Sequence, residues 1–557
     1  MDFHALGEDL LQQHVLSHVS FVTMARLQCT CTLMRNIGRR IARQPYVRTH
    51  MLKGYTSEPP AETSLLTVGE LTHVLGRAQV STAEVEREAG SDENLRCALG
   101  DCLERARGEL GADDAPSGRG SSLRGALRDV AQARALLARL AMPARPDICL
   151  VFASKAMAGV AEVLATLLPT SCVVFGAVSN RGVIGSHGAC VSEVDSDAQP
   201  LIAATLIHLA GTRIYPFFEP RTDPHTRARV PCADVTDAVA RARERAARGA
   251  PAESATLLVL ADGADGLMRG AGLIEQLHGK GIPALGGLVE RDPAGTLLLR
   301  APHRAELRAG LRRGDGSIGL LLEGCHVAVP AVTRGATPIS PHEWDVVEAE
   351  SSSRAVCPGH NASQHVVKTL AGPRQPDCEG NGGSAPRRTT PLQALHELAA
   401  QHGGSLPSPL YLALRPNSTD ARRRLVHPVQ VLHHTGALAV ESEVGVGELC
   451  GFASVNAQGS SDELALCARA ARGRLTGAGP TLCVSFVCCG RGVGFHQAAD
   501  KETLPLRSEF PDATCVGFFA AGELGPRPFG EAGSDREDEP ALMGFTAVHA
   551  LLRFNAQ

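Results

Sequence analysis

Two short apolar runs near the carboxyl end constrain the fold more than any other feature of the chain. Residues 482–489 and 515–521 each have the length of a buried strand, and each leads into a glycine-bearing segment. Between them, Leu504, Leu506 and Phe510 have the spacing of a short amphipathic helix. Strand, helix and strand in this order predict a βαβ-like unit, and open α/β sheets bind ligands beyond the carboxyl ends of their strands.

The segments after these runs supply candidate binding residues. Gly490 and Arg491 follow the first run, and Gly522 and Glu523 follow the second in a predicted loop. A guanidinium and a carboxylate at neighbouring strand ends can bind a small zwitterion such as an amino acid. They can equally form a structural ion pair between two loops, and the residues alone leave both interpretations open.

Cys488 comes just before the first of these loops. The nearby guanidinium of Arg491 can lower the pKa of its thiol and make the thiol reactive. The alternative, which the apolar strand around it favours, is a buried cysteine that packs as a small hydrophobic residue.

An earlier segment repeats the order of strand, helix and strand. Residues 148–153, 156–168 and 172–178 predict these three elements, and the last strand runs into Ser179. The spacing implies parallel pairing with a right-handed crossover. Further strands are predicted at 255–261, 282–287, 429–433 and 437–444, a strand pair at 316–332 around Glu323 and Gly324, a strand or helix at 543–554, and helices at 123–140, 390–402 and 461–475.

Residues 3–45 carry apolar side chains at helical spacing but too few of them for a core of their own. Such a unit packs either on the rest of the chain or on another protein. The positions expected to face a partner are Leu6, Leu10, Leu11, Val15 and Leu16.

Two parts of the chain resemble known families. The leading segment resembles an F-box through these residues, Leu27 and Cys31, although Gly7 replaces the usual proline and Met34 stands where tryptophan is common. The runs FVCCGRG, GFF and GELG within 486–525 resemble the carboxyl-terminal part of a FIST domain, and the segment that ends at Ser179 resembles the start of its amino-terminal half. The resemblance implies an α+β or α/β protein: a small all-α F-box-like unit, then a large mixed α/β FIST domain in two halves.

We expect four regions along the chain. They are an F-box-like helical domain at 1–50, a variable helical and linker segment at 51–122, the FIST amino-terminal half at 123–335, and the FIST carboxyl-terminal half at 336–557 with an inserted loop near 373–390.

The resemblance implies a non-catalytic substrate-recognition subunit of an SCF-type ubiquitin ligase. The leading leucines would dock on a Skp-family adaptor joined to a cullin scaffold, and the FIST domain would hold a protein substrate. The alternative is an intracellular sensory FIST module with a vestigial F-box, which binds a small amino-acid-like ligand. The residues expected to line the ligand or substrate pocket are Ser179, Cys488, Gly490, Arg491, Gly522 and Glu523.

Composition and charge limit the partners and the cellular location expected for this chain. The formal net charge of −4 gives no basic field for nucleic acid, and no apolar run reaches the roughly 18 residues of a membrane span. The 17 cysteines form no small-domain disulfide framework, and the first residues lack the pattern of a signal peptide. We therefore expect an intracellular protein, cytoplasmic or nuclear or both, that contacts neither nucleic acid nor membrane.

The motifs of common enzymes and metal sites do not occur in the sequence. His396 and His402 are six residues apart, whereas a zinc-protease helix needs histidines four apart, and the cysteines lack paired C-x-x-C spacing. A G-x-S-x-G turn is also missing. We therefore expect a protein that is not an enzyme and has no cofactor and no structural metal.

Overall fold

The computed structural model describes part of the 557-residue chain. The described residues are 43–54, 118–187, 190–194, 199–220, 240, 244, 247–248, 255–262, 283–289, 297–301, 316–324, 326–334, 336–340, 342–352, 364–373, 387–406, 410–415, 424–426, 428–440, 444–526, 540–543 and 545–555. The predicted F-box-like helices, with Leu6, Leu10, Leu11, Val15 and Leu16, lie outside these ranges.

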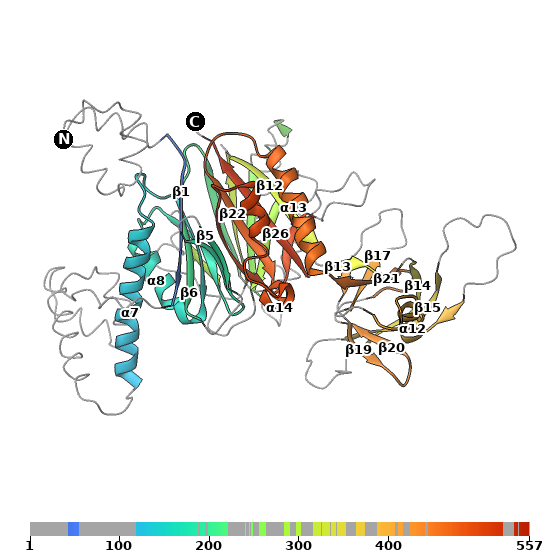
Figure 1. The fold of residues 1–557 in the computed structure, drawn as a ribbon. Coiled ribbons are helices and arrows are strands. Elements are labelled where there is room, and N and C mark those ends of the chain that lie inside the picture. The colour runs from blue at the N-terminus through green and yellow to red at the C-terminus, as the bar shows by residue number, and fades with distance from the viewer. Residues whose placement is uncertain are drawn as a thin grey trace, which may run out of the picture.

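The described part of the chain contains four β-sheets, three of which share one core (Figure 1). The first sheet has the order β1-β6-β2-β3-β10, and its helices α7 and α8 pack on its outer face. Its strands and helices are β1 (Tyr46–Lys53), α7 (Gly118–Arg139), β2 (Ile148–Ser154), η5 (Lys155–Met157), α8 (Ala158–Leu167), β3 (Val173–Ser179), β6 (Leu201–His208) and β10 (Leu297–Arg300).

The second sheet has the order β25-β24-β9-β8-β11-β7 and contains strands from distant parts of the chain. Its strands are β7 (Arg213–Pro220), β8 (Ala255–Asp262), β9 (Ala284–Val289), β11 (Gly316–Glu323), β24 (Glu523–Pro526) and β25 (Pro540–Met543).

The third sheet has the order β12-β26-β22-β23-β4-β5, and α13 and α15 pack on its outer face. Its elements are β4 (Val183–His187), β5 (Cys190–Val194), β12 (His326–Arg334), α13 (Ala457–Arg474), β22 (Thr481–Cys488), η7 (Cys489–Arg491), α14 (Val493–His496), α15 (Leu504–Glu509), β23 (Thr514–Ala520) and β26 (Thr546–Phe554).

The fourth sheet forms a lobe at one end of the molecule and has its own core (Figure 1). Its order is β18-β17-β21-β14-β15-β20-β19, with β13 on β21 and β16 on β15. Its elements are β13 (Ala336–Pro338), β14 (Trp344–Ser352), β15 (Gln364–Pro373), β16 (Arg388–Thr389), α12 (Pro391–Gln401), β17 (Leu410–Arg415), β18 (Arg424–Val426), β19 (Pro428–Leu432), β20 (Ala437–Val440) and β21 (Leu449–Val455).

The first three sheets are built on the same plan. Each contains one parallel pair, β2 with β3, β8 with β9 or β22 with β23, and an antiparallel strand beside the first member of the pair. Each second strand has a glycine where it approaches its partner, and a Cβ on Gly517 would lie 1.9 Å from the carbonyl oxygen of Ser485. The sequence prediction of parallel pairing in the two βαβ-like units is therefore confirmed.

Apolar side chains from these three sheets meet in the main core. Phe152 of the first sheet stacks on Phe518 of the third with 5.4 Å between ring centroids, and Phe486 meets Phe518 edge-on at 5.9 Å. All three rings are fully buried. The prediction of a large mixed α/β body is confirmed for the described residues, with far more strand than helix.

The two predicted halves exchange strands. Strands β4 and β5 belong to the amino-terminal half by sequence, yet β4 pairs with β23 of the carboxyl-terminal half. Conversely, β24 pairs with β9. Both halves therefore contribute to the second and third sheets.

Two local predictions differ from the structure because backbone pairing reaches beyond the local sequence, and a third, which left two alternatives open, is decided in favour of a strand. The loop predicted at 522–525 lies mostly within β24, whose backbone bonds to β9 and β25. The predicted strand pair at 316–332 does form two strands, but β11 pairs in the second sheet and β12 in the third. Residues 543–554, predicted as strand or helix, contain the strand β26.

The predicted region boundaries also cut through elements. Strand β1 crosses the boundary at residue 50 and pairs along its whole length with β6. Helix α7 begins before the boundary at residue 122. Near the predicted inserted loop, β15 ends at Pro373 and β16 begins at Arg388, and residues 374–386 between them lie outside the described ranges. Within the described helices, none combines the length and the hydropathy needed to cross a bilayer.

Candidate functional site

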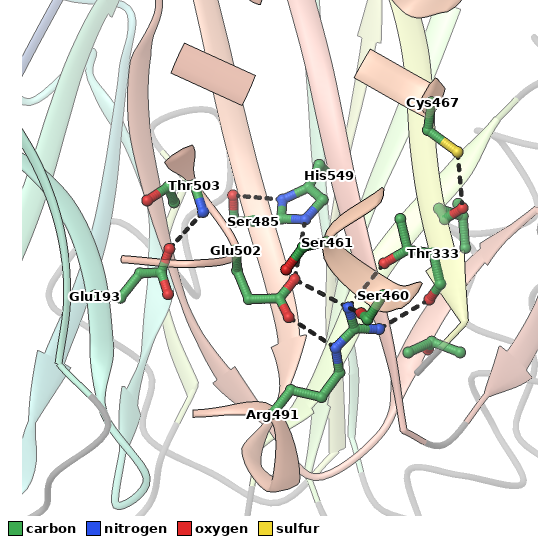
Figure 2. A network of polar contacts seen from close by, with 12 residues as sticks. Glu193, Thr333, Ser460, Ser461, Cys467, Ser485, Arg491, Glu502, Thr503 and His549 are labelled. Carbon is green, nitrogen blue, oxygen red and sulfur yellow. Dashed lines mark hydrogen bonds and ion pairs between the residues drawn. The ribbon is translucent and has the colours of Figure 1, made fainter. Parts of the chain in front are cut away.

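A buried guanidinium lies at the carboxyl end of β22, where the sequence predicts a binding residue. Arg491 ends the short turn η7, and its side chain is 0% exposed. Its Nε and one terminal nitrogen donate to the two carboxylate oxygens of Glu502 at 2.9 and 3.1 Å. This bidentate pair, shown in Figure 2, is the strongest geometry available to these two groups.

Two further elements hold the same guanidinium. Its terminal nitrogens donate to the backbone oxygen of Thr333 at 3.1 Å, to the Thr333 hydroxyl at 3.0 Å and to the Ser460 hydroxyl. Thr333 lies on β12 and Ser460 on α13 (Figure 2). Arg491 therefore joins the turn after β22 to the edge strand β12 of the third sheet and to the helix α13 that covers the sheet.

Glu502 is ionised inside the protein. Burial raises the pKa of its carboxyl, but the charge of Arg491 and a hydrogen bond with His496 outweigh burial and lower this pKa to about 2. His496 Nε2 lies 2.5 Å from one oxygen of Glu502, and His549 Nε2 lies 3.9 Å from the other. The carboxylate thus lies among three basic side chains.

A chain of polar side chains continues from His549 into the third sheet. His549 Nδ1 lies 3.0 Å from the Ser485 hydroxyl, which lies 3.4 Å from Cys483 Sγ. A hydrogen bond with Cys515 lowers the pKa of the Cys483 thiol, burial raises it, and His549 lowers it again, which brings it to about 5. These side chains are at most 1% exposed, so no substrate reaches the thiolate in this conformation.

Glu193 links the two halves beside this network. Its carboxylate accepts from the backbone N–H of Thr503 at 2.5 Å, and its own backbone N–H donates to Asp500 at 2.7 Å. Burial raises the pKa of Glu193 to about 8, and the charge of nearby Glu502 adds to that effect. Strand β5 is therefore attached to the segment that carries Glu502 (Figure 2).

The structure separates the predicted pair of Arg491 and Glu523. The ion pair of Arg491 is with Glu502, whereas Glu523 Oε2 accepts from the backbone N–H of Thr546 at 3.2 Å and from its hydroxyl at 2.8 Å. Glu523 is also 0% exposed, and burial raises the pKa of its carboxyl well above the ordinary value. The predicted structural ion pair between the two loops is replaced by Arg491–Glu502 because residue 502 approaches from the segment between the strands.

The other predicted pocket residues lie near the carboxyl ends of neighbouring strands. The Ser179 hydroxyl donates to the backbone oxygen of Phe519 at 3.3 Å, which ties β3 to β23. The backbone oxygen of Gly522 accepts from Leu288 at 2.8 Å, which ties the end of β23 to β9. Hydrogen bonds thus hold the strand ends with Ser179, Gly522 and Glu523 together. The pocket itself stays a prediction.

Cys488 is half-buried at the end of β22. A hydrogen bond with Cys489, burial and the charge of Glu523 raise the pKa of its thiol well above the ordinary value. This direction is the one expected for a thiol that packs as a hydrophobic residue and is opposite to activation by Arg491.

Sequence reasoning missed most of the groups around the Arg491–Glu502 pair. Thr333 and His549 gave a weak signal, since each is a polar side chain inside an otherwise apolar strand. Glu502 gave none, because it lies in a charged segment that resembles a solvated surface. In the described ranges, no cluster of three or more His, Cys, Asp and Glu side chains has the arrangement of a metal site.

Two family models match the chain over most of this body. The FIST N domain matches residues 147–356, and the FIST C domain matches residues 391–526. The chain therefore carries both FIST domains, which generally serve in ligand sensing.

Relatives among curated proteins match a shorter stretch. The uncharacterised protein Mb0898c of Mycobacterium bovis is 36% identical over 119 residues, which are 21% of this chain and 28% of that protein. The uncharacterised protein MT0656 of Mycobacterium tuberculosis is 33% identical over 117 residues, again 21% of this chain and 28% of that protein. The chain thus spans little more than a quarter of the length of these relatives.

Proposed function

We propose that this chain is a non-catalytic substrate-recognition subunit of an SCF-type ubiquitin ligase. The observation that carries the proposal is the order of its parts: an F-box-like leucine pattern in the leading segment, then a FIST N domain and a FIST C domain. The leading leucines would dock on a Skp-family adaptor, which binds the cullin scaffold, and the FIST body would hold a protein substrate in the cytoplasm or the nucleus.

The physical argument rests on size and burial. A leading segment of about 45 residues with a few leucines buries too little apolar area to be stable alone. We therefore expect a protein partner to bury these leucines. In the body, Arg491, Glu502 and His549 are fully buried and bound to one another or to neighbouring elements. Their polar atoms are engaged within the fold and away from solvent, which supports a receptor whose contribution is binding.

A receptor of this kind acts by proximity. Holding the substrate and the charged conjugating enzyme on one scaffold raises the effective concentration of substrate lysines, and the receptor itself supplies no reacting group.

Co-purification with the Skp-family adaptor and the cullin tests this proposal. The double substitution Leu10→Asp with Leu11→Asp places two charges on the predicted docking face and is expected to abolish recovery of both partners. Leu466→Asp is the matched control, because Leu466 is 64% exposed on α13 and lies far from the leading segment in sequence. Failure of the unmodified chain to bind, or equal binding by the double variant, would refute the proposal.

Ligand sensing by the FIST body is the second candidate. It is supported by Glu523, a fully buried carboxyl whose Oε1 has no hydrogen-bond partner among the described residues. A thermal-shift screen against amino acids tests this candidate. A ligand at 100 times its dissociation constant stabilises the folded state by about 2.7 kcal/mol, and this gain should vanish in Glu523→Gln if the carboxyl contacts the ligand.

A further inference from the structure

Two adjacent cysteines stand where β22 passes into the turn η7. Cys488 is half-buried as the last residue of the strand, and Cys489 is exposed as the first residue of the turn. Their side chains form a hydrogen bond with each other, and both thiols are reduced. A solvent-accessible sulfur therefore lies next to a second, more protected sulfur.

The surroundings enclose this pair on its inner side. Cys488 packs against a small aromatic cluster that includes Tyr411 and Phe545, whose rings lie 5.3 Å apart. The ring of Phe545 also covers the next residue, since a Cβ on Gly490 would lie 3.0 Å from it. Aromatic and apolar side chains therefore cover the inner side of the pair, and Cys489 is its exposed member.

A carboxyl group completes the site. Glu523 is 0% exposed, its Oε1 has no hydrogen-bond partner among the described residues, and its charge interacts with those of both Cys488 and Cys489. Burial raises the pKa of this carboxyl well above its ordinary value, so near neutral pH it places no fixed negative charge beside the pair.

We infer that Cys488 and Cys489 form a dithiol modification site, which closes to a vicinal disulfide by exchange with a small disulfide such as glutathione disulfide. This inference goes beyond the proposed function and does not depend on it.

The reaction proceeds in two exchange steps. The Cys489 thiolate attacks one sulfur of glutathione disulfide, the disulfide bond breaks, and one glutathione leaves as a thiolate that takes up the proton lost by Cys489. Cys488 then attacks Cys489 Sγ, and the second glutathione leaves with its electron pair and takes up the proton lost by Cys488. Overall, the protein loses two hydrogens and two electrons, and one glutathione disulfide becomes two glutathione molecules.

Closure of this ring acts on the buried network through the backbone. The turn η7 contains Cys489 and Arg491, and Arg491 holds Glu502 and Thr333 (Figure 2). A disulfide between neighbouring residues restricts the peptide that joins them. Oxidation is therefore expected to shift the thermal unfolding of the body.

The test exposes the full-length folded protein to glutathione disulfide, then quenches, alkylates and digests it for mass spectrometry. The expected early product is the peptide with Cys488 and Cys489 lighter by two hydrogens and without alkylation. Cys483 and Cys515 are an internal control, because they also share a hydrogen bond but are at most 1% exposed. They should remain reduced until the protein unfolds.

Variants separate the two steps. Cys488→Ser should stop at a glutathione adduct on Cys489, and Cys489→Ser should give neither product. The inference fails if the unmodified protein accumulates only the adduct on Cys489. It also fails if the pair reacts no faster than Cys483 and Cys515, and neither outcome bears on adaptor binding.

Discussion

At the scale of single residues, the buried charges of the third sheet are the most consequential feature. Arg491 and Glu502 are both at most 1% exposed, and each has further polar partners that compensate for the loss of water. A buried pair of this kind adds little stability compared with apolar residues of the same shape, but loss of one member leaves the other charge uncompensated.

Removing one member of the pair should therefore lower the free energy of unfolding strongly. Arg491→Met is expected to lower the free energy of unfolding by about 3–5 kcal/mol, and joint removal with Glu502→Leu should cost less than the sum of the two single changes. The measurement is urea unfolding of all four proteins. Arg472→Ala is the control, because Arg472 is 63% exposed in its pair with Glu509 and should change stability by about 1 kcal/mol or less.

Glu193 makes a prediction about pH. Its pKa rises from the ordinary 4.5 to about 8 on folding, so the folded state binds this proton more tightly than the unfolded state. The contribution of Glu193 to stability is thus complete below pH 4.5 and is lost as the pH rises to about 8. The glutamine of Glu193→Gln cannot ionise. The stability of the unmodified protein relative to this variant should therefore fall between pH 4.5 and about 8 and should stay constant at higher pH.

The opposite sign applies to Glu502. Its folded pKa of about 2 lies below the ordinary 4.5, so its contribution is present above pH 4.5 and is lost as the pH falls toward 2. Urea unfolding at a series of pH values distinguishes the two residues, because their windows lie on opposite sides of pH 4.5. A Glu193 effect confined to pH values below 4.5 would contradict the assignment.

At the scale of elements, parallel strand pairs are the unit that the sequence predicts best. The runs at 148–153, 172–178, 482–489 and 515–521 all form strands because their apolar residues match the length of a strand buried on both faces. Residues 522–525, GELG, are predicted as a loop because they have no strand preference, yet β24 covers Glu523–Pro526. Only its backbone bonds to β9 and β25 make it a strand.

A glycine decides how closely one of these pairs can approach. Gly517→Ala would place a Cβ 1.9 Å from the backbone oxygen of Ser485 and should destabilise the protein by about 3 kcal/mol or more, since backbone must move apart. Gly473→Ala is the matched control on helix α13, where nothing lies within 4 Å, and should stabilise by about 0.5–1 kcal/mol. Equal effects of the two substitutions in chemical denaturation would contradict this explanation.

At the scale of the whole molecule, the exchange of strands makes the two FIST halves depend on each other. Strand β4 needs β23 as its neighbour, β12 needs β26, and β24 needs β9. The fourth sheet differs, because all its strands and its core come from residues 336–455.

Fragments should therefore behave differently according to where they are cut. A fragment of residues 336–455 is expected to fold alone, whereas fragments 1–335 and 336–557 should each leave the second and third sheets unfolded and should recover structure when mixed. Circular dichroism and hydrogen exchange of the separate and mixed fragments test this. Independent folding of the third-sheet strands in fragment 336–557 would contradict the interdependence.

The local units can be predicted from the sequence alone: the apolar runs that become buried strands and the helices between them follow from periodicity and composition within a few tens of residues. The FIST domains are recognised instead by the resemblance of short motifs such as GELG and by the two family models. The pairing of Arg491 with Glu502, the contact of Glu193 with Thr503 and the exchange of strands between the two halves emerge only in the tertiary structure. The physical reason is that burial and hydrogen bonding depend on which segments meet in space, and Glu193 and Thr503 are 310 residues apart in the chain.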